Sequence, residues 1–377
     1  MNATAIAGAA RRRIATRAGD RTALAVFAGA LFLSAALLFS VQPMFARLVL
    51  PTLGGSPSVW AVAMCFLQAT LLLGYGYAHL LNRYGGARLG LALHLILLAA
   101  ALASLPFGLP EMLGPPPAEG AYLWLIGVLT LGVGLPFFAV SANAPLLQAW
   151  FARTDHPDAA DPYFLYGASN LGSLLALLAY PVLVEPLFGL ARQGAIWADG
   201  LALLAGLVLV WLTPATATAI VEAAASTWTD RCAWVLLAMV PSGLLVAFTT
   251  HLTTDLASAP FLWVLPLAVF LATFILTFRD RPIVPHRWAL AVQPVAVAAA
   301  AAGLILPGAA DWTWGLFLGA GFVAFVATTL VAHRILYERR PASSGLTAFY
   351  LWMSFGGVLG GVFAGLLAPQ IFDEVQE

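Results

Sequence analysis

The chain has 377 residues, of which 62% are hydrophobic and only 9% are charged, and its mean hydropathy is +0.91. These values lie outside the range of soluble globular domains and predict a protein whose surface mostly faces lipid. Seventeen basic and seventeen acidic residues cancel, so the chain lacks the excess of basic charge that attracts nucleic acid. We therefore expect an integral membrane protein that binds the lipid bilayer and no nucleic acid.

Eleven apolar stretches are long enough to cross a hydrocarbon core, which takes about twenty helical residues. Turn signals rich in glycine and proline separate them. The predicted spans are residues 22–49, 57–81, 87–106, 121–150, 162–188, 193–213, 232–256, 260–278, 287–306, 312–333 and 346–372. The sequence therefore predicts an all-α polytopic membrane protein with about eleven transmembrane helices.

The first span follows a basic segment, residues 1–21, which contains five arginines. A signal peptide also begins with a basic segment, but the apolar run that follows here is too long and has no small-residue cleavage site. We therefore predict a retained first helix, preceded by a basic cytoplasmic tail over residues 1–21.

Arginines mark alternate ends of the predicted spans. Since cytoplasmic loops of membrane proteins are enriched in arginine and lysine, this distribution places the N-terminus in the cytoplasm and the C-terminal end of the last span on the other side. The arginines on the predicted cytoplasmic side include Arg83, Arg88, Arg153, Arg231, Arg279, Arg281, Arg287, Arg334, Arg339 and Arg340. His333 is interpreted together with the last three of them as part of a cytoplasmic anchor.

A weak internal repeat divides the chain into two halves. Pro57-Ser-Val-Trp60 reappears as Pro260-Phe-Leu-Trp263, and the segment beginning at Phe164 resembles the one beginning at Tyr350. Both pairs are six spans apart, which predicts a parallel repeat about an axis along the membrane normal, as in two-halved secondary carriers. The predicted parts are a six-helix half over residues 22–213, a cytoplasmic linker over 214–230 and a five-helix half over 231–373.

Several longer runs resemble one protein family when taken together. They are Val41-Gln-Pro-Met-Phe-Ala-Arg47, residues 54–60, residues 161–173, His251-Leu-Thr-Thr-Asp255 with the five residues after it, and residues 349–357. They resemble the membrane portion of bacterial fused major-facilitator/spermidine-synthase-like proteins, in the family's order from about residue 30 to 373. The resemblance implies a major-facilitator-like fold in a bacterial inner membrane.

The fused members of that family continue into a soluble synthase-like domain, and this sequence departs from that pattern. It shows no glycine-rich nucleotide loop followed by a paired acidic site. The glycine cluster of residues 356–361 lies inside an apolar stretch and is interpreted as a site of close helix packing. We therefore expect no enzymatic activity from these residues, and a separate synthase-like protein is a candidate partner.

Polar side chains inside the apolar spans are the candidates for a solute cavity, because such groups are costly in lipid unless they are paired or hydrated. The predicted cavity residues are Gln42, Arg47, Asn143, Tyr166, Asn170, Ser173, His251, Asp255, Tyr350 and Trp352. Pro43 predicts a local break of the first helix beside Gln42. The alternative interpretation is structural: hydrogen bonds between helices, snorkelling of Arg47 to the headgroups, and capping of a helix by Asp255.

The sequence also offers candidate ion pairs between charged residues near the ends of the spans. Arg47 and Asp255 lie near the outer ends of the first helices of the two halves, so they are candidates to pair and to close the outer side. Glu185 and Asp199 are both close enough in sequence to pair with Arg192.

The sequence predicts no metal site and no cofactor. It contains neither a C-x-x-C nor an H-E-x-x-H run, and Cys65 and Cys232 fall at different depths of their spans, which excludes a disulfide between them. The leading functional hypothesis is a secondary carrier for a small polar or cationic organic solute, with polyamines as one option. The alternative is a membrane module that does not transport but anchors or regulates a synthase-like enzyme.

Overall fold

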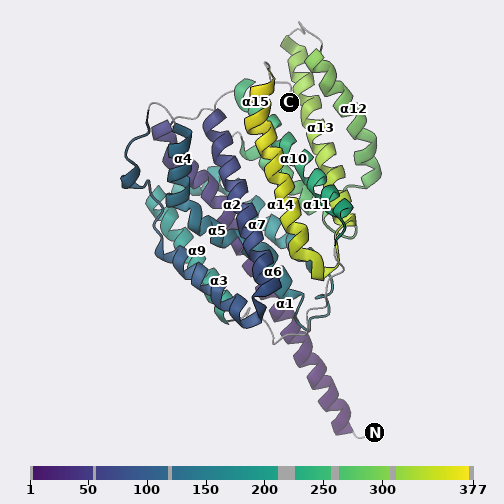
Figure 1. The fold of residues 1–377 in the computed structure, drawn as a ribbon. Helices are drawn as coiled ribbons and strands as arrows, with labels where there is room; N and C mark the ends of the chain where they lie inside the picture. Colours follow the sequence, from purple (N-terminus) through teal and green to yellow (C-terminus); the bar gives the residue numbers. More distant parts are fainter. Residues whose placement is uncertain are drawn as a thin grey trace.

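The computed structural model describes residues 3–53, 57–117, 121–210, 226–255, 263–305 and 311–372. Regular structure in these ranges is entirely helical (Figure 1). Nine of the described helices or helix chains are long and apolar enough to cross a membrane, and the shorter α11 and the 20-residue α12 fall in two further predicted spans. The predicted all-α membrane bundle is confirmed.

The first half contains six of these spans, two of which are built from consecutive shorter helices. Its elements are α1 (Ala3–Leu53), α2 (Pro57–Tyr84), α3 (Gly86–Ala103), η1 (Glu111–Leu113), α4 (Ala121–Leu129), η2 (Thr130–Gly134), α5 (Leu135–Ser141), α6 (Asn143–Phe151), η3 (Pro162–Phe164), α7 (Leu165–Ala179), η4 (Tyr180–Val184), α8 (Glu185–Leu187) and α9 (Leu190–Val210).

The second half follows residues 211–225, which lie outside the described ranges. These residues include most of the predicted linker. Its elements are α10 (Trp228–Asp255), α11 (Val264–Thr277), α12 (His286–Ile305), α13 (Asp311–Glu338), η5 (Ser343–Gly345), α14 (Leu346–Val362), η6 (Phe363–Leu367) and α15 (Ala368–Ile371).

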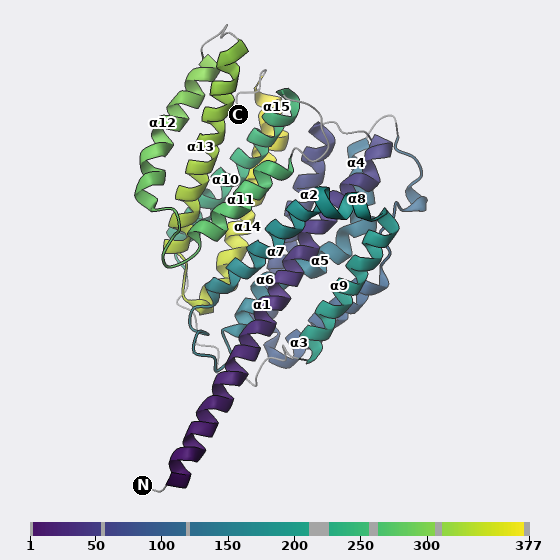
Figure 2. The same ribbon diagram turned by 180° about the vertical axis from the view of Figure 1, so that it is seen from behind.

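The two halves lie side by side, with their outermost helices on opposite flanks. Helices α3 and α9 form one flank and α12 and α13 the other, while α1, α2, α7, α10 and α14 lie between them (Figures 1 and 2). Helix α1 is continuous from Ala3 and projects beyond the bundle at its N-terminal end. The predicted break beside Gln42 does not occur, and Pro43 lies inside the helix, as membrane helices tolerate.

Helix contacts repeat with the predicted offset of six spans. Within the halves, the pairing of α1 with α7 has its counterpart in the pairing of α10 with α14. Between the halves, α2 packs on α14 and α7 packs on α11. These two contacts are equivalent, because an offset of six spans relates α2 to α11 and α7 to α14. The packing therefore has the pseudo-twofold pattern that a parallel duplication produces.

The ends of the fifth and eleventh spans also have the same conformation. Each passes from a long helix into a five-residue π-helical segment, η4 or η6, and then into a short helix with proline near its start. Each short helix ends at a phenylalanine with extended backbone, Phe188 or Phe372. Proline removes a backbone donor, so a local change of the helical hydrogen-bond pattern at both positions has the same cause.

The glycine cluster in α14 brings this helix close to α10. A Cβ atom added at Gly356 would overlap the carbonyl oxygen of Val235, and one added at Gly360 would overlap that of Met239. Glycine at these positions therefore sets the distance between the helices, as expected for small residues in membrane helices.

Candidate functional site: a cavity between the halves

A cavity of about 170 Å³ lies where the two halves meet. Its walls come from α1, α2, α5 and α7 of the first half and from α10, α11, α13 and α14 of the second. Its volume far exceeds the ~15 Å³ that one water needs. Most of the lining is aliphatic or aromatic, and the polar side chains among the lining residues are Gln42, Gln68, Tyr75, Tyr166, Ser242, His333 and Ser354.

Three of these side chains present a buried polar atom that has no hydrogen-bond partner in the described part of the chain. The atoms are Oε1 of Gln42, Oε1 of Gln68 and Oγ of Ser354. An unsatisfied buried polar group costs about 1–3 kcal/mol. Because all three residues line the same cavity, water or a solute in that cavity is in a position to satisfy them.

Two other polar groups of the lining, Ser242 and His333, have partners within the protein. Ser242 donates its hydroxyl hydrogen to the carbonyl oxygen of Gly357 at 2.8 Å. His333 is buried, its Nδ1 lies 2.9 Å from the Thr273 hydroxyl, and its ring stacks on Phe274 with centroids 3.5 Å apart. The interpretation of His333 as part of a cytoplasmic anchor is therefore wrong, since α13 turns this side chain into the bundle.

An aromatic cluster lies beside the cavity and contains residues of both halves. Tyr166 is central to it, with its ring centroid 5.2 Å from that of Tyr350 and 5.4 Å from that of Phe274. Tyr75 and Tyr163 complete the contacts around Tyr350. Since Tyr75, Tyr166 and Phe274 also line the cavity, the cluster forms one wall of it.

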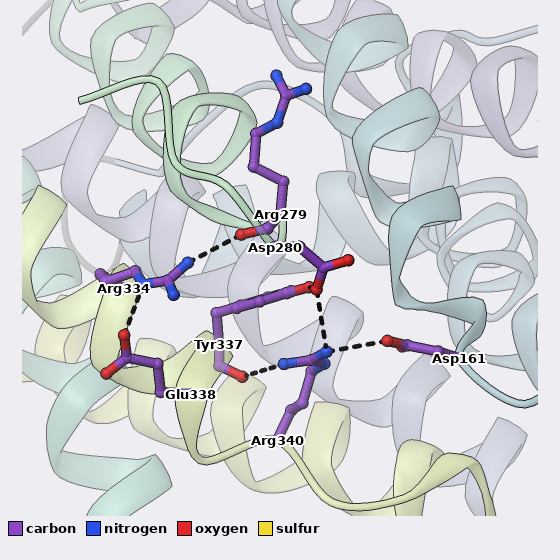
Figure 3. A network of polar contacts seen from close by, with 7 residues as sticks. All are labelled: Asp161, Arg279, Asp280, Arg334, Tyr337, Glu338 and Arg340. Atoms are coloured by element: carbon purple, nitrogen blue, oxygen red, sulfur yellow. Dashed lines mark hydrogen bonds and ion pairs between the residues drawn. The ribbon is translucent and has the colours of Figure 1, made fainter. Parts of the chain in front are cut away.

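A network of charged groups lies beyond this cluster, at the arginine-rich ends of the helices (Figure 3). Nη2 of Arg340 is 2.9 Å from Oδ2 of Asp161, which belongs to the first half, and 3.8 Å from Oδ1 of Asp280 in the second half. The Tyr337 hydroxyl donates to Asp280 at 2.8 Å, and the Arg340 guanidinium lies 3.7 Å from the centre of the Tyr337 ring. Arg340 therefore joins the two halves.

A second hydrogen bond joins the halves at the same level, because the Tyr163 hydroxyl donates to the carbonyl oxygen of Pro341 at 3.0 Å. Partial burial alone would lower the pKa of the Arg340 guanidinium, but the hydrogen bond and charge of Asp161, with Tyr337 and Asp280, raise it above its ordinary value. These contacts therefore favour the charged form of Arg340, as expected of an arginine. We call Asp161, Asp280, Tyr337 and Arg340 the basic-end network.

The structure places two of the predicted cavity residues, Gln42 and Tyr166, in the cavity lining. Tyr350 lies in the adjoining aromatic cluster, where its hydroxyl donates to Oε1 of Gln148 at 2.9 Å. Asn170 and Ser173 share the predicted buried face of α7, but their side chains donate to carbonyl oxygens of their own helix, those of Tyr166 and Ser169.

Three other predicted residues, Asn143, Trp352 and His251, do not line this cavity. Asn143 is buried inside the first half, where its Oδ1 lies 3.1 Å from Nε2 of His94. Trp352 contacts the Trp228 ring and the Arg231 guanidinium at the start of α10. His251 is half-buried near the end of α10 and does not line the cavity.

Arg47 pairs with a residue of its own half. Its Nη1 is 3.7 Å from Oε1 of Glu185 and donates to the Glu185 carbonyl oxygen at 3.4 Å, so Glu185 has Arg47 as a partner where the sequence suggested Arg192. Asp255 ends α10, and its side chain lies outside the described residues, so the suggested pairing of Arg47 with Asp255 stays a prediction.

Sequence reasoning did not identify Gln68, Ser242 and His333 as lining residues. Gln68 is an amide side chain inside an apolar span, and this sequence feature could have identified it as a lining residue. Among the described residues, no group of three or more histidine, cysteine, aspartate or glutamate side chains is placed to hold a metal ion.

Comparison with solved structures identifies the fold. The chain is similar to the human organic anion transporter MFSD10 (TETRAN), with a TM-score of 0.53 and 16% identity over 93% of each chain. It is also similar to a bacterial homologue of the iron transporter ferroportin in an outward-facing state, with a TM-score of 0.53 and 14% identity over 93% of each chain.

A third similar structure is the proton:xylose symporter XylE of the major facilitator superfamily, with a TM-score of 0.52 and 13% identity over 93% of this chain and 89% of that one. No protein-family model matches the sequence, and no curated protein matches it. The chain therefore has a major-facilitator-like, two-halved fold, as the sequence predicted.

Proposed function

We propose that this protein is a secondary carrier that moves a small organic solute through the cavity between its halves. The observation that carries the proposal is the position of that cavity: both halves line it, and the basic-end network joins the halves on one side of it. A carrier of this architecture works by rocking one half against the other around a site at their interface. The arginine-rich end is then the cytoplasmic side of a bacterial inner membrane.

The similar structures support a carrier but not a particular solute. Their names refer to an organic anion, to xylose and to iron, which have different chemistry. A polyamine finds little support in the lining, because the lining residues of the described chain include no carboxylate to pair with its ammonium groups.

The resemblance to fused synthase-like proteins supports a second hypothesis, in which the membrane part only anchors or regulates a synthase-like partner. The two hypotheses differ in whether the halves must separate at the basic end. A carrier must open there in each cycle, whereas an anchor has no such requirement.

The test is solute flux in proteoliposomes with a reversible cross-link across the basic end. In a background with Cys65→Ala and Cys232→Ala, the double variant Asp161→Cys/Arg340→Cys is treated with a reducible bifunctional thiol reagent. Labelled xylose, benzoate, spermidine and benzamide are the solutes. We expect saturable flux of at least one of them, its loss on cross-linking and its recovery on reduction.

The matched control is Arg334→Cys/Glu338→Cys, which places the same two thiols one turn apart on α13, where the native pair is 2.7 Å apart. Cross-linking this control should leave flux unchanged. Absence of flux for every solute would overturn the carrier proposal, provided that the variant unfolds at the same temperature as the unmodified protein and is therefore folded. Co-purification of a synthase-like enzyme in that case would support the anchor.

A further inference from the structure

We infer that the cavity takes an uncharged organic molecule that carries one or two hydrogen-bond donors on a compact, largely apolar frame. The inference deepens the proposed function and rests on it for the solute's passage, but the binding class follows from the lining alone.

The first argument is charge. Among the described residues that line the cavity, none is an aspartate, glutamate, lysine or arginine, and the ion pairs of the described chain lie elsewhere. Arg47 with Glu185 is one, and Arg340 with Asp161 is another. A charged solute would lose its hydration in this cavity without gaining a fixed counter-charge, which is strongly unfavourable. His333 provides an imidazole that is already engaged by Thr273 and Phe274.

The second argument is the number and kind of free polar atoms. Gln42, Gln68 and Ser354 each present an oxygen that lacks a partner in the described residues, and they come from α1, α2 and α14. A solute with N–H or O–H donors would satisfy these acceptors. Because polar side chains are a minority of the described lining, a polyol would leave many of its hydroxyl groups without partners, and its binding would be weak.

The third argument is the remainder of the wall. Tyr75, Tyr166, Phe270 and Phe274 present aromatic surface, and aliphatic side chains fill the spaces between them. Such a wall favours an aromatic or aliphatic frame, as in small-molecule sites where a few polar groups fix the orientation of the ligand. Together the three features describe a neutral amphipathic molecule.

The experiment uses four probes with the same ring and different head groups. Benzamide is neutral and donates, benzylamine is a cation near neutral pH, benzoate is an anion and toluene has no donor. Binding of each to the full chain in lipid nanodiscs is measured by competition with labelled benzamide. We expect benzamide to bind at least about tenfold more tightly than benzylamine or benzoate.

Two variants connect this preference to the named atoms. Gln42→Leu and Gln68→Leu keep the approximate size of the side chain but remove the amide, so each should weaken benzamide binding about fivefold to tenfold and leave toluene binding unchanged or stronger. Gln293→Leu is the matched control, because Gln293 lies on α12, donates to Thr328 on α13 and does not line the cavity.

The outcomes separate the inference from the carrier proposal. Tighter binding of benzylamine or benzoate than of benzamide would overturn the inference and leave a carrier for a charged solute. Benzamide binding that is equal in Gln42→Leu, Gln68→Leu and Gln293→Leu would also overturn it, as would absence of binding for all four probes in folded protein. Selective benzamide binding without flux would support the inference and count against a carrier.

Discussion

At the scale of single residues, the contact between Tyr350 and Gln148 joins the two halves inside the bundle. Both side chains are buried, and the Gln148 amide is satisfied on its other side because Nε2 donates to the carbonyl oxygen of Ala144 at 3.0 Å. The Tyr350 hydroxyl is therefore the group that satisfies Oε1 of Gln148. Removing it leaves a buried acceptor without its donor.

We predict that Tyr350→Phe lowers the free energy of unfolding by about 1 kcal/mol, between the ~0.6 kcal/mol typical of a membrane hydrogen bond and the ~3 kcal/mol upper cost of a buried orphaned group. The measurement is unfolding of the purified protein in detergent. Tyr122→Phe is the control, because Tyr122 lies exposed on α4. Equal stability of the two variants would mean that the contact with Gln148 contributes nothing.

At the scale of helices, the sequence predicted the spans and the repeat well because the signals for both are local. Hydropathy over twenty residues defines a span, and Pro186 and Pro369 produce the same helix ending in both halves. The residues against which each helix face packs, in contrast, are distant in the sequence. Tyr350 was predicted as a cavity residue, but its partner Gln148 is 202 residues away, and nothing in the sequence indicated that the two would meet.

The cavity lining shows the same limit. His333 directly precedes Arg334 in a stretch with Arg339 and Arg340, so its neighbours in sequence favoured the membrane surface. Consecutive residues of a helix point about 100° apart, and this rotation is what turns His333 inward while Arg334 pairs with Glu338. Which direction faces the core depends on how α13 packs, which the sequence pattern leaves open.

The glycine cluster of α14 gives a prediction at this scale. Gly360→Ala should destabilise the protein by about 1–3 kcal/mol, because its methyl group would overlap the Met239 carbonyl and force α14 away from α10. Gly357→Ala on the same helix should have little effect, since a Cβ there meets no atom within 4 Å. Thermal unfolding of both variants checks this. Because alanine favours a helix more than glycine does, a similar loss of stability in both variants would show that the overlap with the Met239 carbonyl is not its cause.

At the scale of the whole molecule, the basic-end network holds the two halves together on one side of the cavity. Arg340 is the group common to its contacts, with Asp161 on one half and Asp280 and Tyr337 on the other. The side chain of Asp161 is 51% exposed, so water screens the pair and its contribution is modest. In the proposed carrier, such a contact would favour the closed arrangement and would still open in each cycle.

We therefore predict that Arg340→Gln makes the cavity more accessible from the arginine-rich side. In a background with Cys65→Ala and Cys232→Ala, Ser354→Cys places a reporter thiol in the lining, and its rate of modification by a membrane-impermeant thiol reagent is measured in inside-out vesicles. Since a half-exposed ion pair contributes at most about 1 kcal/mol, the rate should rise by no more than about fivefold.

The matched control for this prediction is Arg339→Gln, which removes the same charge from the preceding residue, an exposed position outside the network. It should leave the rate unchanged, whereas Asp161→Asn should raise it as Arg340→Gln does, because either change breaks the same bridge between the halves. If Arg339→Gln and Arg340→Gln raised the rate equally, the effect would come from net charge at the membrane surface, and the network would not be what keeps this side closed.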